Sequence, residues 1–560
     1  MDKSLISKSL LATGVMTLMS FGESSQATEP PNIVIIHADD LNNWLEEFDR
    51  HPQTITPIFN RLMETGINFT NAHANYPVCG PSRASMLTGL HAHTTGYYGY
   101  QQQRNDWRQF DKLSDAVTMI EHFYDNGYNV YGTGKVFHNG HEDWSVWKGD
   151  DPIGHFGYEP SFGPFAWDGS YDRGDWDHAL GLPHPDVLPV DINEHPEFRS
   201  HWGQSLGPLS NIPSYPPNPE TGAPGFDGWI LYGEPWHYED DDNRDLMPDE
   251  LNAQYAAKVL EQDHEKPFFL FVGLNRPHTP FHAPQKYFDM YPLEELQLPS
   301  VKENVLDDVP DVLWNPCQTA NCNGFRAFRQ AIDHPRVDNM WLKHVQAYLA
   351  NVTFVDDIVG DIMASVRGSR HADNTIVIIT SDHGLHLGEK EYLRSKTTIW
   401  EESTHVPFII WASGLEHPGA RITHPVSLID LYPTIIDFAG LPSEPNANGN
   451  GLPLDGHSLR PFVENPDFSD WDGPDFALTS IASGEELEVN EPGIPARQFH
   501  SIRTERYRFS LMPNGDMELY DHKNDPYEWT NLARVEGHEE LLREFRRKLL
   551  DYVVRDQNGR

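Results

Sequence analysis

Continuous apolar runs, rather than alternating ones, are the clearest pattern along this chain. Residues 32–37 and 375–380 are rich in β-branched side chains, and residues 267–273 form a third run. A strand that is apolar at successive positions has both faces covered, which is typical of a parallel sheet between helices. The pattern therefore predicts an α/β fold. Helices are expected around Pro57–Thr65, Thr118–Asn126, Pro248–Gln262, Asn339–Arg367 and Leu428–Ala439.

Polar residues follow each of the three predicted strands. They are Asp39 and Asp40 after the first, Asp382 and His383 after the second, and His278 after the third. Because the carboxyl ends of parallel strands meet at one edge of a sheet, these side chains are expected to cluster there. Clustered carboxylates repel one another unless they are protonated or bridged by a cation. Oxygen ligands favour Ca²⁺ or Mg²⁺, with His383 as a further ligand. The alternative is that the acids are solvated loop residues.

Cys79 opens the segment Cys79–Arg83, in which Gly-Pro precedes Ser and Arg and a helix-like stretch follows. This arrangement puts a thiol at a helix N-terminus beside a guanidinium. Such a place stabilises anions and activates a nucleophile. The alternative is a buried structural cysteine in a turn.

The start of the chain indicates export. A basic segment, an apolar stretch and a small-residue site predict that residues 1–27 are a secretory signal peptide. In an oxidising compartment Cys317 and Cys322 are expected to pair, which leaves Cys79 as the odd one of three cysteines. The predicted location is therefore secreted or periplasmic, and Cys79 is predicted to be reactive or modified.

The charge of the chain limits its partners. It has 84 acidic residues against 41 basic ones, and its formal net charge is −43. A surface this acidic repels nucleic acid and anionic lipid, so neither is expected as a partner. No segment after the signal peptide is apolar enough to cross a membrane. An anionic substrate would have to meet a local positive pocket.

Four basic side chains are candidates for such a pocket: Lys135, His138, His278 and Lys396. Lys135 and His138 share a glycine turn after a predicted strand, a setting that suits anion binding and proton transfer. Prolines stiffen the loop of His278, and Lys396 lies in the loop after the second strand. Taken singly, a surface lysine or a packed histidine is the more frequent explanation of each.

Composition also divides the chain. The stretch 142–245 is rich in Trp, Pro, Gly, Asp and His with little periodicity, so we expect an insertion on the sheet edge that contributes substrate subsites. The predicted divisions are a catalytic domain at 28–441, a linker region at 442–475 and a C-terminal subdomain at 476–560. Antiparallel strands are expected in that subdomain at 501–509 and 517–521, and a helix at 539–554.

Several short motifs occur in one order along the chain. They are an apolar strand plus Asp-Asp, C-x-P-x-R, G-K-x-x-H, P-H-x-P-F, S-D-H-G-x-x-L-G-E, T-H-V-P and E-L-Y-D-H-x-x-D-P. Together they resemble the type I sulfatases over nearly the whole mature chain. The finer spelling is most similar to the iduronate-2-sulfatase branch, with His383 where many sulfatases have Asn.

This resemblance implies an alkaline-phosphatase-like α/β fold with a large mixed, mainly parallel sheet and a small C-terminal α+β subdomain. It also implies that a modifying enzyme oxidises Cys79 to formylglycine, whose hydrate is the nucleophile. The implied reaction is hydrolysis of sulfate esters on a sulfated carbohydrate, either a uronate 2-sulfate or an algal unit such as ulvan.

The resemblance also implies roles for single residues. One Ca²⁺ ion would be held by Asp39, Asp40, Asp382, His383 and the modified Cys79. Arg83 would hold the formylglycine hydrate, and the sulfate would be bound by Lys135, His278 and Lys396. His278, with Lys396, would protonate the departing alcohol, and His138 would take a proton from the hydrate.

The chain departs from the family pattern at two places. Leu90 stands where many relatives have Arg. The segment between Asp382 and His405 is one residue longer than in the iduronate-2-sulfatase branch, which leaves Arg394 as an alternative to Lys396. Sugar-binding candidates, each more often a packing residue, are Tyr97, Tyr98, Arg104, Trp107, Arg108 and Trp314. The rival functions are a phosphate or phosphonate monoester hydrolase of the same superfamily and a catalytically silent carbohydrate-binding protein.

Overall fold

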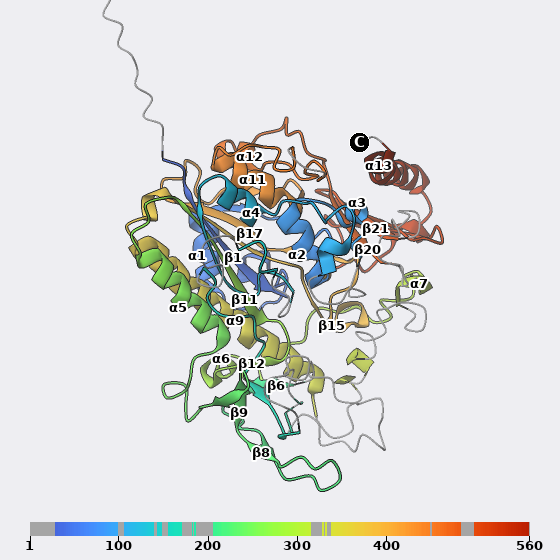
Figure 1. Cartoon of the computed structure of the whole chain (residues 1–560). Coiled ribbons are helices and arrows are strands. Elements are labelled where there is room, and N and C mark those ends of the chain that lie inside the picture. Colours follow the sequence, from blue (N-terminus) through green and yellow to red (C-terminus); the bar gives the residue numbers. More distant parts are fainter. Residues whose placement is uncertain are drawn as a thin grey trace, which may run out of the picture.

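A seven-stranded sheet forms the centre of the part of the chain that the computed structural model describes (Figure 1). The described residues are 29–98, 106–138, 143–147, 155–170, 182, 184–185, 205–314, 327–329, 331–332, 338–447, 451–482 and 498–558. In spatial order the strands are β18 (Arg421–Ile422), β2 (Ile67–Phe69), β17 (Phe408–Ala412), β13 (Thr375–Ser381), β1 (Asn32–Asp39), β11 (Phe268–Pro277) and β4 (Asn129–Gly134).

The centre of this sheet is parallel. β1 pairs in parallel with β13 on one side and β11 on the other, and β11 pairs in parallel with β4. β17 is antiparallel to both β13 and β2, so the sheet is mixed. The three strands expected from continuous apolar runs are therefore confirmed as central, neighbouring strands.

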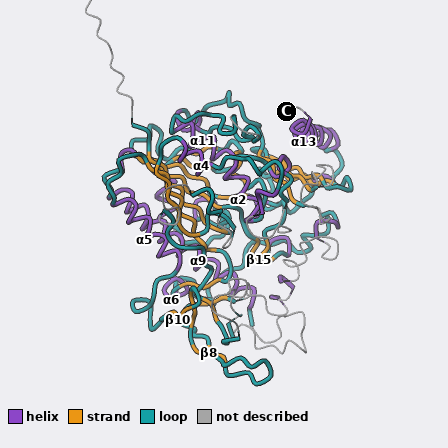
Figure 2. Tube along the Cα trace, viewed as in Figure 1, coloured by secondary structure: helices purple, strands orange, loops and turns teal. Residues whose placement is uncertain are grey.

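Helices cover both faces of the sheet, and Figure 2 shows the strands enclosed between them. One face packs against α1 (Pro57–Thr65), α5 (Pro248–Glu261) and α9 (Met340–Gly368). The other face packs against α2 (Cys79–Thr88), α4 (Met119–Asp125), α11 (Leu431–Phe438) and α12 (Arg460–Glu464). The helices expected from the sequence are confirmed, with ends that shift by a few residues.

The side chains of β1 show why its apolar run has no alternation. Val34 and Ile36 belong to the core on the face of α1, α5 and α9, whereas Ile33 and Ile35 belong to the core under α2 and α11. All four are at most 1% exposed. Successive side chains of a strand point to opposite faces, so a strand between two helical layers must be apolar throughout.

A separate four-stranded antiparallel sheet forms the small C-terminal subdomain. Phe509 stacks on Phe545 of the terminal helix, with ring centroids 5.8 Å apart. The segment 501–509 contains the turn of a hairpin between two strands. In order the elements are β20 (Ala477–Ile481), β21 (Phe499–Arg503), β22 (Tyr507–Leu511), β23 (Met517–Asp521) and α13 (Glu539–Asn558).

Short strands and helices complete the described part. Three-stranded sheets join β16 (His405–Val406), β3 (Ala72–His73) and β19 (Val426–Ser427), and β10 (Glu234–Trp236), β9 (Trp229–Leu231) and β5 (Phe165–Ala166). Strand pairs are β12 (Phe281–Ala283) with β6 (Leu206–Pro208), β14 (His386–Leu387) with β15 (Leu393–Ser395), and β7 (Ser214–Tyr215) with β8 (Phe226–Asp227). Short helices are α3 (Ala92–Thr95), α6 (Gln285–Asp289), α7 (Asp311–Trp314) and α10 (Glu401–Thr404).

Some predictions lie outside the described residues. They are the signal peptide at 1–27, the pairing of Cys317 with Cys322, Arg104 and part of the 142–245 insertion. The domain boundaries remain predictions. Within the described residues, none of the helices has the length and apolar character needed to span a membrane.

Candidate active site

The register of the parallel strands explains why the predicted acids meet. β1 and β13 pair Ala38 with Ser381, so Asp39 and Asp382 come next on neighbouring strands. Asp40 then takes a left-handed conformation, with φ of 64°, which turns the chain out of the strand. Its backbone N–H donates to Asp382 Oδ1 at 3.1 Å. The carboxyl ends of the two strands thus form one wall of a site.

The structure brings all ten predicted site residues to this edge of the sheet. Each of them has a hydrogen bond or an ion pair with another member of the group. They are Asp39, Asp40, Cys79, Arg83, Lys135, His138, His278, Asp382, His383 and Lys396.

Cys79 is the first residue of α2 and is fully buried. Two side chains of the same helical turn bind the end of β13. Ser82 Oγ donates to the backbone oxygen of Asp382 at 2.6 Å, and Arg83 Nε donates to its Oδ2 at 3.0 Å. A Cβ atom on Gly80 would lie 3.0 Å from Tyr97 Oη, so a larger residue beside Cys79 would have to displace that phenol slightly. The helix N-terminus is therefore held against the acidic wall.

Three basic side chains approach the sulfur atom of Cys79. Lys396 Nζ lies 3.0 Å from Sγ, His383 Nε2 lies 3.3 Å from it, and His138 makes a side-chain hydrogen bond with it. Burial would raise the pKa of Cys79, but the charges of Lys135 and Lys396 outweigh this effect and hold that pKa well below its ordinary value. The site favours an anion at this position.

The acids of the site are also paired with cations. Lys135 Nζ donates to Asp39 Oδ2, and Lys396 Nζ donates to Asp40 Oδ1 at 2.7 Å. Burial would raise the pKa of Asp382, but the charges of His383 and Arg83 lower it below its ordinary value. The carboxylate of Asp382 is therefore held in the ionised form that a metal ion requires.

The donor set fits one hard metal ion. Single ligand atoms of Asp39, Cys79, Asp382 and His383 lie within 4.8 Å of one another, and those of Asp39, Asp40, Cys79 and His278 do so as well. Asp39 Oδ1 is buried and accepts no hydrogen bond from the described residues. A buried carboxylate oxygen without a donor is costly unless a cation completes it. These residues therefore fit a Ca²⁺ or Mg²⁺ ion.

The ring of His278 is fixed by two contacts. Nδ1 lies 2.6 Å from the backbone oxygen of Thr279, so this nitrogen carries the hydrogen and Nε2 faces Asp40 Oδ2 at 3.8 Å. Phe162 stacks on the imidazole with ring centroids 4.3 Å apart, and Lys135 Nζ lies 4.8 Å from the centre of the same phenyl ring. Phe162 thus positions two of the basic groups.

No pattern in the sequence predicted a role for Phe162 or for the residues that hold its loop. Arg276 Nη2 donates to the backbone oxygen of Phe162 at 2.7 Å. Asp249, in the first turn of α5, accepts the backbone N–H groups of Asn275 and Arg276 at 2.8 and 2.9 Å. Phe162 lies in the insertion without periodicity, where no pattern marks it. The Asn-Arg-Pro-His segment at the end of β11 was the available signal for Arg276.

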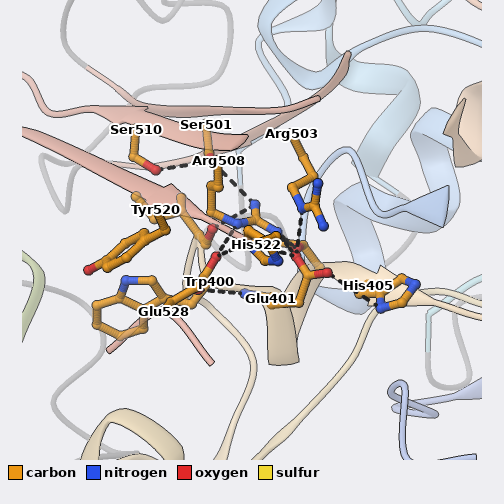
Figure 3. A network of polar contacts seen from close by, with 12 residues as sticks. Trp400, Glu401, His405, Ser501, Arg503, Arg508, Ser510, Tyr520, His522 and Glu528 are labelled. Atoms are coloured by element: carbon orange, nitrogen blue, oxygen red, sulfur yellow. Dashed lines mark hydrogen bonds and ion pairs between the residues drawn. The ribbon is translucent and has the colours of Figure 1, made fainter. Parts of the chain in front are cut away.

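The C-terminal subdomain contacts the segment that follows Lys396, and Figure 3 shows Trp400 and Glu401 of that segment beside side chains of the subdomain. Arg508 on β22 donates to the backbone oxygen of Ile399 at 3.0 Å. Trp400 Nε1 donates to Glu518 Oε2 on β23 at 3.1 Å. Since Lys396 itself reaches Cys79, the structure places this lysine rather than Arg394 beside the thiol.

The same region contains a second group of potential metal ligands: Glu401, His522 and Glu528. Arg508 donates to Glu401 Oε2 and, at 2.6 Å, to Glu528 Oε1. Burial would raise the pKa of Glu528, but the charge of Arg508 lowers it to about 2. Because guanidinium groups already neutralise these carboxylates, the group is an ion-pair network and not a second metal site (Figure 3).

The sugar-binding candidates whose side chains the structure describes are packing residues. Tyr98 is 1% exposed, and Trp107 stacks on Phe137 with ring centroids 5.9 Å apart. Arg108 binds Glu121 and Asp143 at 2.9 and 2.8 Å. Tyr97 packs on Phe110, and Leu90 is buried in the core under α2. Arg104 and the side chain of Trp314 lie outside the described residues.

Curated relatives are similar along most of the chain. A sulfatase of Formosa agariphila is 29% identical over 506 residues, which cover 90% of this chain and 83% of that protein. The iduronate 2-sulfatase of Mus musculus is 26% identical and covers 96% and 97%. An ulvan-active sulfatase of Formosa agariphila is 27% identical and covers 94% and 81%.

A solved structure confirms the alkaline-phosphatase-like fold. The phosphonate monoester hydrolase of Agrobacterium radiobacter superposes with a TM-score of 0.62 at 20% identity, covering 94% of this chain and 96% of that one. Residues 388–555 match the family described as N-sulphoglucosamine sulphohydrolase, C-terminal. Residues 31–441 match the family described as Sulfatase. The chain therefore belongs to the sulfatase family, and it is a sulfuric ester hydrolase.

Proposed function

We propose that this protein hydrolyses a sulfate ester on a sulfated carbohydrate, either a uronate 2-sulfate or an algal unit such as ulvan, through a formylglycine at position 79. The observation that carries the proposal is the placement of Cys79: it starts α2, between Lys396, His383 and a wall of carboxylates. The sulfur atom stands where the oxygens of the hydrated aldehyde would lie. The names of the curated relatives, iduronate 2-sulfatase and ulvan-active sulfatase, support the substrate class.

One Ca²⁺ ion, held by Asp39, Asp40, Asp382, His383 and the modified Cys79, would supply charge that favours the ionised nucleophile and offsets the sulfate oxygens. Arg83 would hold the formylglycine hydrate; its guanidinium binds Asp382 and lies 3.5 Å from Asp39. Lys135 and Lys396 would face the sulfate, where fixed cations stabilise the charge that develops on its oxygens.

Two histidines would move protons. His278 presents Nε2 to the site and, in its doubly protonated form, would donate the Nε2 proton to the departing alcohol, with Lys396 beside it. Burial lowers the pKa of His138 to about 4, so its ring is neutral at physiological pH. A neutral imidazole that hydrogen-bonds the side chain at position 79 is suited to take a proton from it.

Removal of the metal is expected to abolish most of the sulfate release, because the positive charge that favours the ionised nucleophile and offsets the sulfate oxygens would be lost. The experiment is to treat the purified protein with a chelator and to measure activity before and after adding Ca²⁺ or Mg²⁺. The melting temperature, measured in the same samples, should fall on chelation and recover with the ion that restores activity. A chelated protein with full activity and an unchanged melting temperature would rule out the metal site.

We also propose that the protein is secreted or periplasmic and that its partners are the sulfated carbohydrate and a formylglycine-generating enzyme. The phosphonate monoester hydrolase with the same fold supplies the main alternative function. In the described residues the only other cluster of potential metal ligands is the ion-pair network at Glu401. This favours a single ion and a sulfate ester over a phosphatase with a second metal site.

The function is tested by sulfate release from a panel of compounds. The panel holds heparin and dermatan disaccharides, ulvan and carrageenan oligosaccharides, an aryl sulfate, and matched phosphate and phosphonate esters. We expect release from uronate 2-sulfates or ulvan fragments, and turnover of phosphate esters that is slower by orders of magnitude. Faster turnover of a phosphate or phosphonate ester would overturn the proposal. Binding of the sugars without turnover, with an unmodified thiol at position 79, would indicate the silent carbohydrate-binding protein.

A further inference from the structure

Arg394 is the half-buried middle residue of β15. Its Nε atom is buried without a hydrogen-bond partner, and among the described residues its side chain forms neither a hydrogen bond nor an ion pair. Its backbone φ is 52°, in the left-handed region that a bulky residue rarely occupies. Strain of this kind persists at functional sites, where the surrounding structure imposes it.

Among the described residues, the fully buried arginines have partners for their guanidinium groups. Arg83 donates to Asp382, Arg508 donates to Glu401 and Glu528, and Arg276 donates to four backbone oxygens. A guanidinium has five N–H donors, and leaving them unpaired away from water is costly. Single guanidinium nitrogens of Arg83 and Arg244 also lack a hydrogen bond, but these side chains have other partners, whereas the half-buried side chain of Arg394 has none among the described residues.

Arg394 also has no acidic neighbour in the described part of the chain. Burial lowers its pKa to about 10, and no neighbouring carboxylate opposes that effect. The chain has 84 acidic residues against 41 basic ones, so a cation without an acidic partner is unexpected on composition alone. An anion supplied from outside the protein would satisfy this guanidinium.

The place of Arg394 in the chain puts it near the proposed reaction. It precedes Lys396 by two residues, and two residues span at most about 7 Å. Lys396 Nζ lies 3.0 Å from the sulfur atom of Cys79. The hairpin is fixed, because β15 pairs with β14 and His386 Nε2 lies 2.7 Å from Thr398 Oγ1. Figure 1 shows β15 close to α2, the helix that starts at Cys79.

We propose that Arg394 is a specificity-determining residue that binds a second anionic group of the substrate, one that lies on the same sugar as the scissile sulfate or on its neighbour. The inference rests on the proposed function and deepens it, since it limits the substrate to dianionic sugars. The planar fork of a guanidinium matches the two oxygens of a carboxylate or a second sulfate. Lys396 binds the group that reacts, and Arg394 binds the group that does not.

The test compares three sulfate esters in the wild-type enzyme, Arg394→Met and Arg394→Lys. The esters are an aryl sulfate with no second anionic group, a 2-sulfated uronate disaccharide, and a disulfated sugar without a carboxylate. We expect Arg394→Met to raise KM about tenfold to a hundredfold for whichever dianionic ester the enzyme uses, the loss typical of a charged hydrogen bond. The aryl sulfate should be unaffected, and Arg394→Lys should recover part of the loss.

The matched control is Arg367→Met. Arg367 is on α9, where its guanidinium lies over the ring of Trp411 on β17, and it has no part in the proposed site. It should leave all three esters unchanged. An Arg394→Met variant that cleaves every ester as the wild type does would overturn the inference. Equal losses on all three esters, the aryl sulfate included, would also overturn it, because the residue would then act on the reaction or on the fold.

A binding measurement separates this inference from the proposed function. The unsulfated uronate disaccharide and a singly sulfated sugar without a carboxylate are titrated calorimetrically into the wild type and Arg394→Met. Tighter binding of either anion by the wild type, by tenfold or more, supports the role of Arg394 even if no sulfate ester is cleaved. Sulfate release with equal binding by both proteins would leave the proposed function standing and refute the role of Arg394.

Discussion

A Cys79→Ala variant is expected to release no measurable sulfate from any ester that the wild-type protein cleaves. The sulfur atom is the point on which Lys396, His383 and His138 converge. Alanine leaves those groups in place but removes the thiol that the modifying enzyme needs to form the aldehyde, so no hydrate nucleophile can form at position 79. Loss of a nucleophile typically lowers kcat on the order of 10⁶-fold. The measurement is sulfate release from each ester in a separate assay. Mass spectrometry of the peptide that contains position 79 shows whether the wild type carries formylglycine.

The matched control for this variant is Met86→Leu. Met86 lies on the same helix and is fully buried in the core under α2. A volume-conserving exchange of this kind is usually tolerated, so activity should stay near the wild-type value. Cys79→Ser should be active only if the host modifies serine. Sulfate release by Cys79→Ala, or by wild-type protein with an unmodified thiol, would contradict the formylglycine mechanism.

Much of the site edge was predictable because parallel strands leave few alternatives. Two buried strands that each end in acidic residues must bring those residues to the same edge once they are neighbours. Asp39 and Asp382 follow from this rule alone, and the register of β1 with β13 confirms it. The position of Cys79 follows less directly, since nothing in its own segment says which strand α2 packs against. There the family motif supplied what the periodicity could not.

The residues that position the basic groups could not be predicted. Phe162 orients His278 and Lys135 through ring contacts with segments that lie 116 and 27 residues away along the chain. Such contacts depend on the path of an insertion that has no helical or strand period. The hairpin turn at 504–506 was equally hidden, because Thr504, Glu505 and Arg506 contain neither Gly nor Pro, the usual signals of a turn.

One face of the C-terminal sheet contacts the segment next to Lys396 and so helps to position the active site. Phe509 and Leu519 point into the core with α13, whereas Arg508 and Glu518 on the same strands point towards the catalytic part. The alternation of strand side chains thus divides the small sheet into a structural face and a face that contacts the segment of Lys396. Loss of that contact should therefore affect both stability and catalysis.

An Arg508→Met variant is expected to be destabilised by about 3–5 kcal/mol at pH 7, because it leaves the buried carboxylates of Glu401 and Glu528 without their cation. The low pKa of Glu528, about 2, stabilises the wild-type fold above pH 4.5, and this contribution is lost as the pH falls towards 2. The deficit of the variant should therefore shrink on acidification. Urea unfolding at pH 7 and pH 4 measures both effects.

The control for this experiment is Arg506→Met, two residues away on the same hairpin. Arg506 binds Asp521 at 2.7 Å in a surface ion pair, and such pairs contribute little to stability. Its unfolding midpoint should match the wild type, whereas that of Arg508→Met should fall. Because Arg508 also binds the backbone of Ile399, the folded Arg508→Met protein should show a lower kcat at temperatures well below its melting point. Equal midpoints for the two variants would mean that the buried network does not hold the subdomain in place.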